Sequence, residues 1–183
     1  MAGLARPSAT DARPTLDALR RLGIASELAS GDGDVAVTRF AGLVGIDAAH
    51  ARMSPEGKLA HVRDLQAQGR VVAMVGDGIN DGPVLAGADV SFALGDGNAL
   101  AARAADLVLA SPTLLRIPQA IVLARRTRAV IRQNLAWALL YNLLALPAAA
   151  LGMVSPWQAA LGMALSSLLV TANALRLARV PRA

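Results

Sequence analysis

The sequence predicts an α/β domain with a mostly parallel sheet, followed by a transmembrane α-helical hairpin. In residues 1–124, short apolar runs alternate with segments of helical spacing, which is typical of a layered α/β domain. From residue 133 to residue 175 the chain carries no charged residue. That length suits two membrane-spanning helices of about 20 residues each, provided that a turn separates them. We therefore assign residues 1–124 to the α/β domain and residues 125–183 to the hairpin.

Helices and strands alternate along the first part. Helices are expected at residues 13–22, 34–44 and 55–68, from helical spacing of apolar residues and from helix-start signals. The last of these is preceded by a good capping residue, Ser54, and has a proline at its first position, Pro55. Short apolar runs bounded by glycine or polar residues predict strands at residues 24–29, 71–75, 90–94 and 107–109.

Polar residues directly follow two of these strands. Ser30 and Asp32 come after the first, and Asp77 and Asp81 come after the second. In parallel sheets, ligands bind at the carboxyl ends of the strands. Asp77 and Asp81, with Asn80 beside them on a glycine-rich turn, offer the oxygen ligands that Mg²⁺ prefers. An ordinary turn is the alternative, because Gly, Asn and Asp all favour turns.

Lys58 favours phosphate chemistry over an ordinary turn. It is the only lysine among the 18 basic residues of the chain, although a single lysine can also arise by chance. An ammonium group is a compact point charge, which fits at a phosphate group where a planar guanidinium fits less well.

The uncharged stretch is expected to cross a membrane as helices at about residues 131–152 and 156–177. Gly152 and Pro156 supply the turn. Arginines flank both ends of the stretch, whereas the turn is uncharged, so the positive-inside rule predicts that both termini face the cytoplasm. A buried hairpin in a soluble protein is the alternative, but so small a preceding domain has little use for one. We expect an integral membrane protein in contact with lipid.

The polar residues inside the hairpin have two interpretations. At about 100° per residue they fall on one face of each helix: Asn134, Tyr141 and Asn142 in the first, and Met163, Ser166, Ser167 and Asn173 in the second. Such side chains either line an ion path or hold helices together. A thioether is a soft ligand that suits copper(I), and these residues alone do not exclude other metals.

Composition limits the other function classes. The net charge is +5, but aromatic residues make up only 3 % and do not interleave with basic ones, so no nucleic-acid partner is expected. The chain has no cysteine, which excludes disulfides, thiolate metal ligands and a cysteine nucleophile.

Three motifs then occur in a fixed order: Ser30-Gly-Asp32, Pro55-Glu-Gly-Lys58 and Gly76-Asp-Gly-Ile-Asn-Asp-Gly-Pro83. Together they resemble the back half of the phosphorylation domain of P-type ATPases, which has the haloacid-dehalogenase-like fold. The spacing of polar residues in the hairpin resembles the last two membrane helices of the heavy-metal-transporting (type IB) subfamily, specifically its copper(I) branch. The resemblance runs from residue 11 to residue 177, with Gly82 standing where the family usually has alanine.

The resemblance implies a role for each matching residue. Ser30, followed by Asp32, would hydrogen-bond the transferred phosphoryl group, and Lys58 would neutralise it. Asp77 would bind Mg²⁺, while Asp81 and Asn80 would order that loop, with Asp81 as the second carboxylate of the magnesium site. The residues expected to face transported copper(I) are Tyr141, Asn142, Met163 and Ser167.

The chain also departs from the family. It lacks the Asp-Lys-Thr-Gly-Thr segment that such pumps phosphorylate, and it lacks the domain that binds ATP. We therefore expect the carboxyl-terminal part of a longer pump of the bacterial inner membrane, inactive alone. Its partner would be the missing N-terminal half or a split partner chain.

Two other function classes stay open. One is a membrane-anchored phosphatase of the same superfamily, because Asp32-Gly-Asp34 after a strand superficially resembles that superfamily's nucleophile pair. The other is a non-catalytic module that binds an intact pump.

Overall fold

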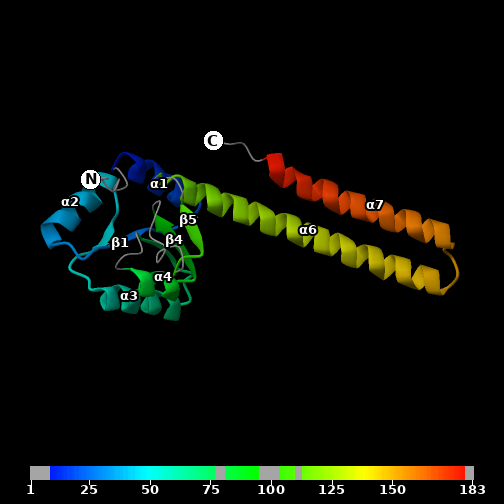
Figure 1. The fold of residues 1–183 in the computed structure, drawn as a ribbon, viewed down its shortest axis with the longest axis horizontal. Helices are drawn as coiled ribbons and strands as arrows, with labels where there is room; N and C mark the ends of the chain where they lie inside the picture. Colours follow the sequence, from blue (N-terminus) through cyan, green and yellow to red (C-terminus); the bar gives the residue numbers. More distant parts are fainter. Residues whose placement is uncertain (1–8, 77–80, 95–103, 110–112, 180–183) are drawn as a thin grey trace. The chain divides into compact units, whose positions relative to one another are not determined.

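The computed structural model describes residues 9–76, 81–94, 104–109 and 113–179. The chain divides into two compact units, Met1–Pro118 and Gln119–Ala183. The first unit holds the strands and the shorter helices, and the second holds most of a long helical hairpin (Figure 1).

All described strands pair in parallel, as expected for strands that alternate with helices along the chain. β1 (Glu27–Ala29) pairs with β2 (Ala48–His50), with Ala29 opposite His50. β3 (Ala73–Gly76) pairs with β4 (Val90–Leu94), which pairs in turn with β5 (Leu107–Leu109). The strands form two separate sheets, β1-β2 and β3-β4-β5. In the described part of the chain, β1 and β3 therefore each have a neighbour on one edge only.

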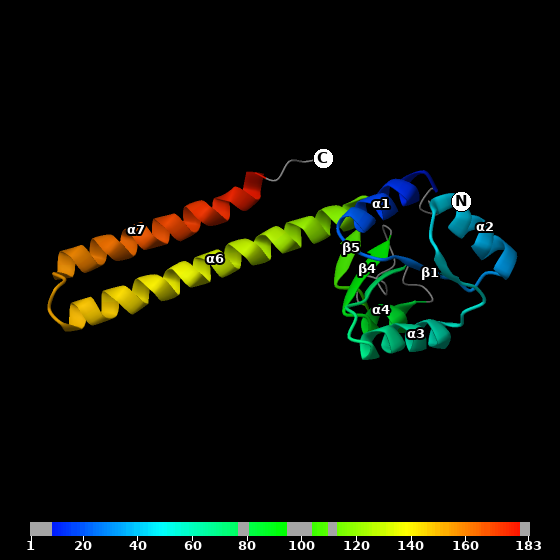
Figure 2. The ribbon, with the colours of Figure 1, turned by 180° about the vertical axis from the view of Figure 1, so that it is seen from behind.

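Four helices cover these strands. They are α1 (Ala9–Arg21), α2 (Asp34–Val44), α3 (Pro55–Ala67) and α4 (Gly82–Gly87). Figures 1 and 2 show α1 on one side of the strands and α3 and α4 on the other, which is the layered arrangement that the alternating pattern predicts. Buried residues of α4 and β4 lie at the centre of the core: Val84, Leu85, Phe92 and Ala93.

Several boundaries differ from those expected. α1 begins at Ala9, so Pro14 lies inside the helix and not at its start, at the cost of one helical hydrogen bond. β1 and β3 are shorter than the apolar runs that predicted them. β2 was not expected, because Ala-Ala-His has none of the β-branched residues typical of strands. α4 was not expected either, because it begins inside the glycine-rich motif.

The hairpin consists of α6 (Arg116–Ala150) and α7 (Pro156–Leu175), which run side by side in opposite directions (Figures 1 and 2). A short 3₁₀ helix, η1 (Arg176–Arg179), follows α7. Gly152 makes the turn with a φ of 71°, a left-handed conformation that glycine adopts without steric cost. The Gln158 side chain accepts a hydrogen bond from the Ser155 backbone N–H at 2.9 Å, which caps the start of α7.

Among the described helices, one is long and apolar enough to cross a membrane by length and composition. It covers the 23 residues Pro156–Ala178. α6 is longer, but the polar side chains in its second half make that half less apolar than α7.

Candidate functional site

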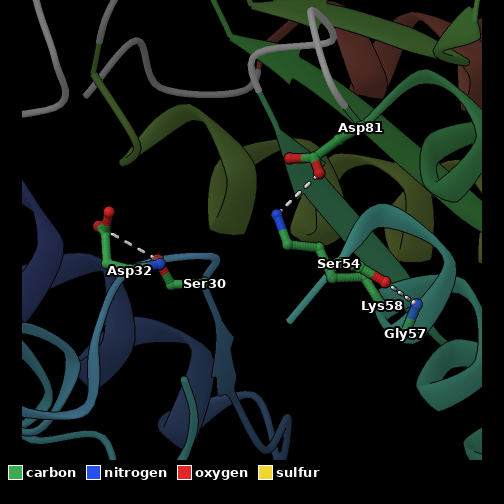
Figure 3. A network of polar contacts seen from close by, with 6 residues as sticks. All are labelled: Ser30, Asp32, Ser54, Gly57, Lys58 and Asp81. Carbon is green, nitrogen blue, oxygen red and sulfur yellow. Dashed lines mark hydrogen bonds and ion pairs between the residues drawn. The ribbon is translucent and has the colours of Figure 1, made fainter. Parts of the chain in front are cut away.

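Lys58 and Asp81 form an ion pair at the carboxyl-terminal end of β3. The Ser54 hydroxyl accepts a hydrogen bond from the Gly57 backbone N–H at 3.1 Å, so the expected cap fixes the first turn of α3. Lys58 lies in that turn, and its Nζ donates to Oδ1 of Asp81 at 2.8 Å (Figure 3). The Lys58 and Asp81 side chains are only 14 % and 13 % exposed. A charge-assisted contact that is so little exposed to water is a strong one.

Gly76 lets the Asp81 carboxylate lie against the end of β3. A Cβ atom on Gly76 would lie 3.2 Å from Oδ2 of Asp81 and 3.3 Å from its Cβ. Asp81 directly precedes α4, and its carbonyl accepts the first helical hydrogen bond from the Leu85 N–H at 2.8 Å. The Asp81 carboxylate offers oxygen ligands of the kind that Mg²⁺ prefers. Asp77 and Asn80, which were expected to complete the magnesium site, lie outside the described residues.

The Ser30 loop is held by backbone hydrogen bonds to the segment that leads into α3. The Ser30 N–H donates to His50 O at 2.9 Å, and the Ser30 carbonyl accepts from Met53 N–H at 2.9 Å. The Asp32 carbonyl accepts from Arg52 N–H at 2.8 Å. Ser54, the cap of α3, is the next residue in the chain after Met53, so this segment links the Ser30 loop to the helix that carries Lys58.

The side chains of this loop make local contacts. The Ser30 hydroxyl accepts a hydrogen bond from the Asp32 N–H at 3.1 Å and donates to Oδ2 of Asp32 at 3.2 Å. Asp34 is paired with Arg52 at 2.7 Å. Figure 3 shows Ser30 and Asp32 as one group and Lys58 and Asp81 as another, and no described hydrogen bond or ion pair joins the two groups. Among the described residues, the expected site residues thus form two separate pairs, Ser30 with Asp32 and Lys58 with Asp81.

The hairpin helices meet along a line of small and polar side chains. From residue 134 to the end of α6, and along α7 and η1, the half-buried residues follow a helical repeat: Asn134, Ala138, Tyr141, Ala145 and Ala148 on α6, and Gly162, Ser166, Val170, Asn173 and Leu177 on α7 and η1. Nδ2 of Asn173 donates to Oδ1 of Asn134 at 2.8 Å, and Nε1 of Trp137 donates to Oγ of Ser166 at 3.1 Å. Small residues and side-chain hydrogen bonds of this kind are typical of helix pairs in membranes.

The residues expected to face a transported ion fall into two sets. Tyr141 is half-buried in the contact between the helices, and its hydroxyl would lie 2.8 Å from a Cβ atom on Gly162. Asn142, Met163 and Ser167 are exposed on the hairpin, and Met163 is 68 % exposed. Three of these four side chains therefore lie on the outside of the hairpin and one lies between its helices.

The structure also contains a cluster of ionisable side chains that was not expected, formed by one residue each from β1, β2 and α3. Oε2 of Glu27 in β1 lies 2.8 Å from Nε2 of His61 in α3 and 3.4 Å from Nε2 of His50 in β2. The hydrogen bond from His61 lowers the pKa of Glu27, and the contact with His50 adds to this effect. Each residue belongs to a different element, so no spacing in the sequence could have indicated the cluster.

Comparison with known proteins agrees with this architecture. Residues 5–89 match the family model of the haloacid dehalogenase-like hydrolases. The chain also superimposes on a zinc-transporting PIB-type ATPase in its E2.Pi state with a TM-score of 0.85 and 40 % identity, covering 92 % of this chain and 28 % of that one. The α/β unit has the haloacid-dehalogenase-like fold.

Curated relatives are P-type ATPases. The chain is 48 % identical over 160 residues to the cation-transporting P-type ATPase B of Mycobacterium bovis. It is 44 % identical over 169 residues to the copper-exporting P-type ATPase of Staphylococcus aureus. These matches cover 87 % and 92 % of this chain but only 21 % of either relative, so the chain spans about a fifth of their length. The names of these similar proteins give different transported ions, which are zinc, copper and an unspecified cation.

Proposed function

We propose that this chain supplies the carboxyl-terminal part of an ATP-driven pump that moves heavy-metal cations, and copper(I) in particular, across the bacterial inner membrane. The Lys58–Asp81 ion pair at the end of β3 carries the proposal, because it joins a lone lysine to the carboxylate loop expected to bind Mg²⁺ and phosphate. The similarity to cation-transporting and copper-exporting P-type ATPases supports it.

The phosphate site would be shared with the missing part of the pump. Ser30 would donate a hydrogen bond to the transferred phosphoryl group, and Lys58 would move from Asp81 to neutralise it. Asp77, with Asp81 as the second carboxylate and Asn80 ordering the loop, would hold Mg²⁺. Phosphoryl transfer depends mainly on positioning and charge stabilisation, and bound Mg²⁺ would supply part of the latter.

A further strand would complete the sheet. β1 and β3 each have one unpaired edge in the described part of the chain, and an extended segment can pair with such an edge through backbone hydrogen bonds. We propose that the missing part inserts its strand between β1 and β3. Its phosphorylated aspartate would then lie at the carboxyl ends of these strands, beside Ser30 and Asp77. ATP would bind to the nucleotide domain of the missing part.

The hairpin would supply part of the transport path. We propose two spans, at about residues 131–152 and 156–177, with both termini in the cytoplasm. Tyr141, Asn142, Met163 and Ser167 would face copper(I). Three of these side chains are exposed on the hairpin and thus available to helices of the missing part, and the Met163 thioether suits copper(I).

Co-expression with the missing part of a related pump tests the phosphate site. The assembled protein should form a magnesium-dependent phosphoenzyme, and Asp77→Asn should abolish it, while the chain alone forms none. Normal phosphorylation of the Asp77→Asn protein would contradict the proposal. Hydrolysis of p-nitrophenyl phosphate by the chain alone, lost in Asp32→Asn, would favour the membrane-anchored phosphatase.

A second experiment tests the transport path in the same assembled pump. Met163→Ala should remove copper(I) stimulation of ATP hydrolysis and leave phosphorylation from inorganic phosphate intact. Met153→Ala is the matched control, because Met153 lies at the turn of the hairpin and is 75 % exposed. Equal loss of both activities in Met163→Ala would indicate a packing role. Unchanged copper(I) stimulation would remove Met163 from the path.

A further inference from the structure

Glu27, His50 and His61 direct three ligand atoms to one point of the first unit. Their ligand atoms all lie within 4.8 Å of one another, although β1, β2 and α3 each supply one residue. Oε2 of Glu27 faces Nε2 of both histidines, at 2.8 Å and 3.4 Å. The two imidazole rings lie with their centroids 4.5 Å apart. The side chains of Glu27, His50 and His61 are 27 %, 40 % and 26 % exposed, so the point is accessible from solvent.

The spacing of these atoms suits a small divalent metal ion. Zinc binds histidine nitrogen and carboxylate oxygen at about 2.0–2.2 Å, which puts neighbouring ligand atoms of a tetrahedral site about 3.3–3.5 Å apart. The observed distances of 2.8 Å and 3.4 Å lie near this range, and all three ligand atoms lie within 4.8 Å of one another, so side-chain shifts of about 1.5 Å or less would form the site. A solvent molecule would occupy the fourth position.

Arg70 supports the carboxylate from its other side. Its guanidinium Nη1 lies 3.8 Å from Oε1 of Glu27, whereas both histidines contact Oε2. An outer contact of this kind orients a ligating carboxylate and leaves its second oxygen for the metal.

We propose that Glu27, His50 and His61 form a binding site for a divalent zinc-like metal ion. The site is separate from the magnesium and transport sites proposed above, and it does not depend on the pump function. Two imidazoles and one carboxylate select zinc and its first-row neighbours, whereas Mg²⁺ prefers an all-oxygen shell.

A metal bound at this site would link β1, which precedes Ser30, to α3, which carries Lys58. Glu27 begins the strand that ends just before Ser30, and His61 lies one helical turn after Lys58 on α3. Because the ligand set exists only when β1, β2 and α3 are assembled, a bound ion would stabilise the folded unit by an amount that rises with the logarithm of the ratio of metal concentration to dissociation constant.

The test uses the full chain in detergent, purified without a polyhistidine tag. Zn²⁺ titrated by calorimetry should bind at one site per chain, and millimolar Mg²⁺ should not displace it. Co²⁺ should give the visible absorption of a tetrahedral site, with no thiolate contribution because the chain has no cysteine. Zn²⁺ should also raise the midpoint of thermal unfolding measured by far-UV circular dichroism.

Three variants decide the assignment of the ligands. His50→Gln, His61→Gln and Glu27→Gln should each weaken Zn²⁺ binding by about 100-fold and remove the thermal shift. Glu56→Gln is the matched control, because Glu56 lies on α3 near its start and away from the cluster, and it should keep both. Circular dichroism of each variant without metal separates loss of the site from loss of the fold. Absence of saturable binding by the parent chain, or binding retained by the His50→Gln/His61→Gln protein, would overturn the proposal and leave an ion-pair cluster.

Discussion

Lys58 on α3 and Asp81 at the start of α4 are 23 residues apart in sequence and form an ion pair of 2.8 Å that is largely shielded from solvent. The pair therefore connects α3 with the start of α4. In this pair the Asp81 carboxylate neutralises the charge of the Lys58 ammonium group. In the proposed function, a phosphoryl group would have to compete with Asp81 for the ammonium group, and its binding would be coupled to the position of Asp81.

Breaking the pair should destabilise the first unit. Lys58→Met leaves the Asp81 carboxylate little exposed and without its cation, which should cost about 2 kcal/mol in the free energy of unfolding. Asp81→Asn should cost a similar amount by leaving the ammonium group without its counter-ion. In the Lys58→Met/Asp81→Asn protein the two losses should not add, and the coupling should be about 1 kcal/mol or more. Urea unfolding followed by circular dichroism measures the cycle, and strictly additive losses would contradict the contact.

Replacing Gly76, the last residue of β3, by alanine should destabilise the protein more than replacing Gly82, the first residue of α4. Gly76→Ala places a Cβ 3.2 Å from Oδ2 of Asp81, so the loop or the carboxylate must shift, at about 1–3 kcal/mol in stability. Gly82→Ala is the control, because nothing lies within 4 Å of its added Cβ. It should be slightly stabilising, by about 0.4–1 kcal/mol, since alanine restricts the unfolded chain. Equal effects of the two substitutions in urea unfolding would rule out the close approach of Asp81 to Gly76.

Asp89 should make stability depend on pH in the acid range. The Val72 N–H donates to its Oδ2 at 2.8 Å, and this backbone hydrogen bond is the main reason that the pKa of Asp89 is lowered from 3.8. A lowered pKa in the folded state means that the contribution is fully present above pH 3.8 and is lost as the pH falls through the folded value. Asp89→Asn should therefore lower the unfolding midpoint at pH 6, and the difference from the parent should shrink below pH 3.8. A constant difference across this range would contradict the charged contact.

Local signals in the sequence were enough to predict several features of the fold. Ser54 caps α3 as expected, because a capping residue acts on the backbone three residues away. β4 and β5 have the expected bounds, and the apolar run of each begins directly after an aspartate, Asp89 or Asp106. Ser30 lies directly after β1, as expected for a loop at the carboxyl end of a parallel strand.

Contacts between distant segments could not be predicted in the same way. Lys58 was assigned to phosphate from its rarity, but its partner Asp81 is set by how α3 packs near the end of β3. The Glu27 cluster depends on β2, whose Ala-Ala-His sequence gives little strand signal. In the hairpin, helical spacing placed Tyr141 and Asn142 on one face, yet one is half-buried against α7 and the other is exposed. Periodicity alone does not fix which part of a broad polar face meets the neighbouring helix.

The topology of the hairpin can be tested with single cysteines, because the chain has none of its own. Ser155→Cys at the uncharged turn should react with an impermeant thiol reagent added outside the cell. Ala67→Cys at the end of α3, where the side chain is exposed, should react only after the membrane is permeabilised, because the flanking arginines favour the cytoplasm. Labelling of Ala67→Cys alone from outside would reverse the proposed orientation.

The contact between Tyr141 and Gly162 should control how closely the two hairpin helices pack. A side chain at position 162 would meet the Tyr141 hydroxyl, which lies 2.8 Å from the position of an added Cβ. Gly162→Leu should therefore separate α6 from α7 and weaken the hydrogen bonds between them, each worth about 0.6 kcal/mol in a membrane. Ala164→Leu is the control, because Ala164 is exposed on the same helix. A thiol crosslinker of short reach can report the separation between Asn134→Cys and Asn173→Cys, whose native side chains touch at 2.8 Å. In bilayers the crosslinked fraction should fall in Gly162→Leu and stay high in Ala164→Leu. An unchanged fraction in Gly162→Leu would mean that the helices do not meet along this line.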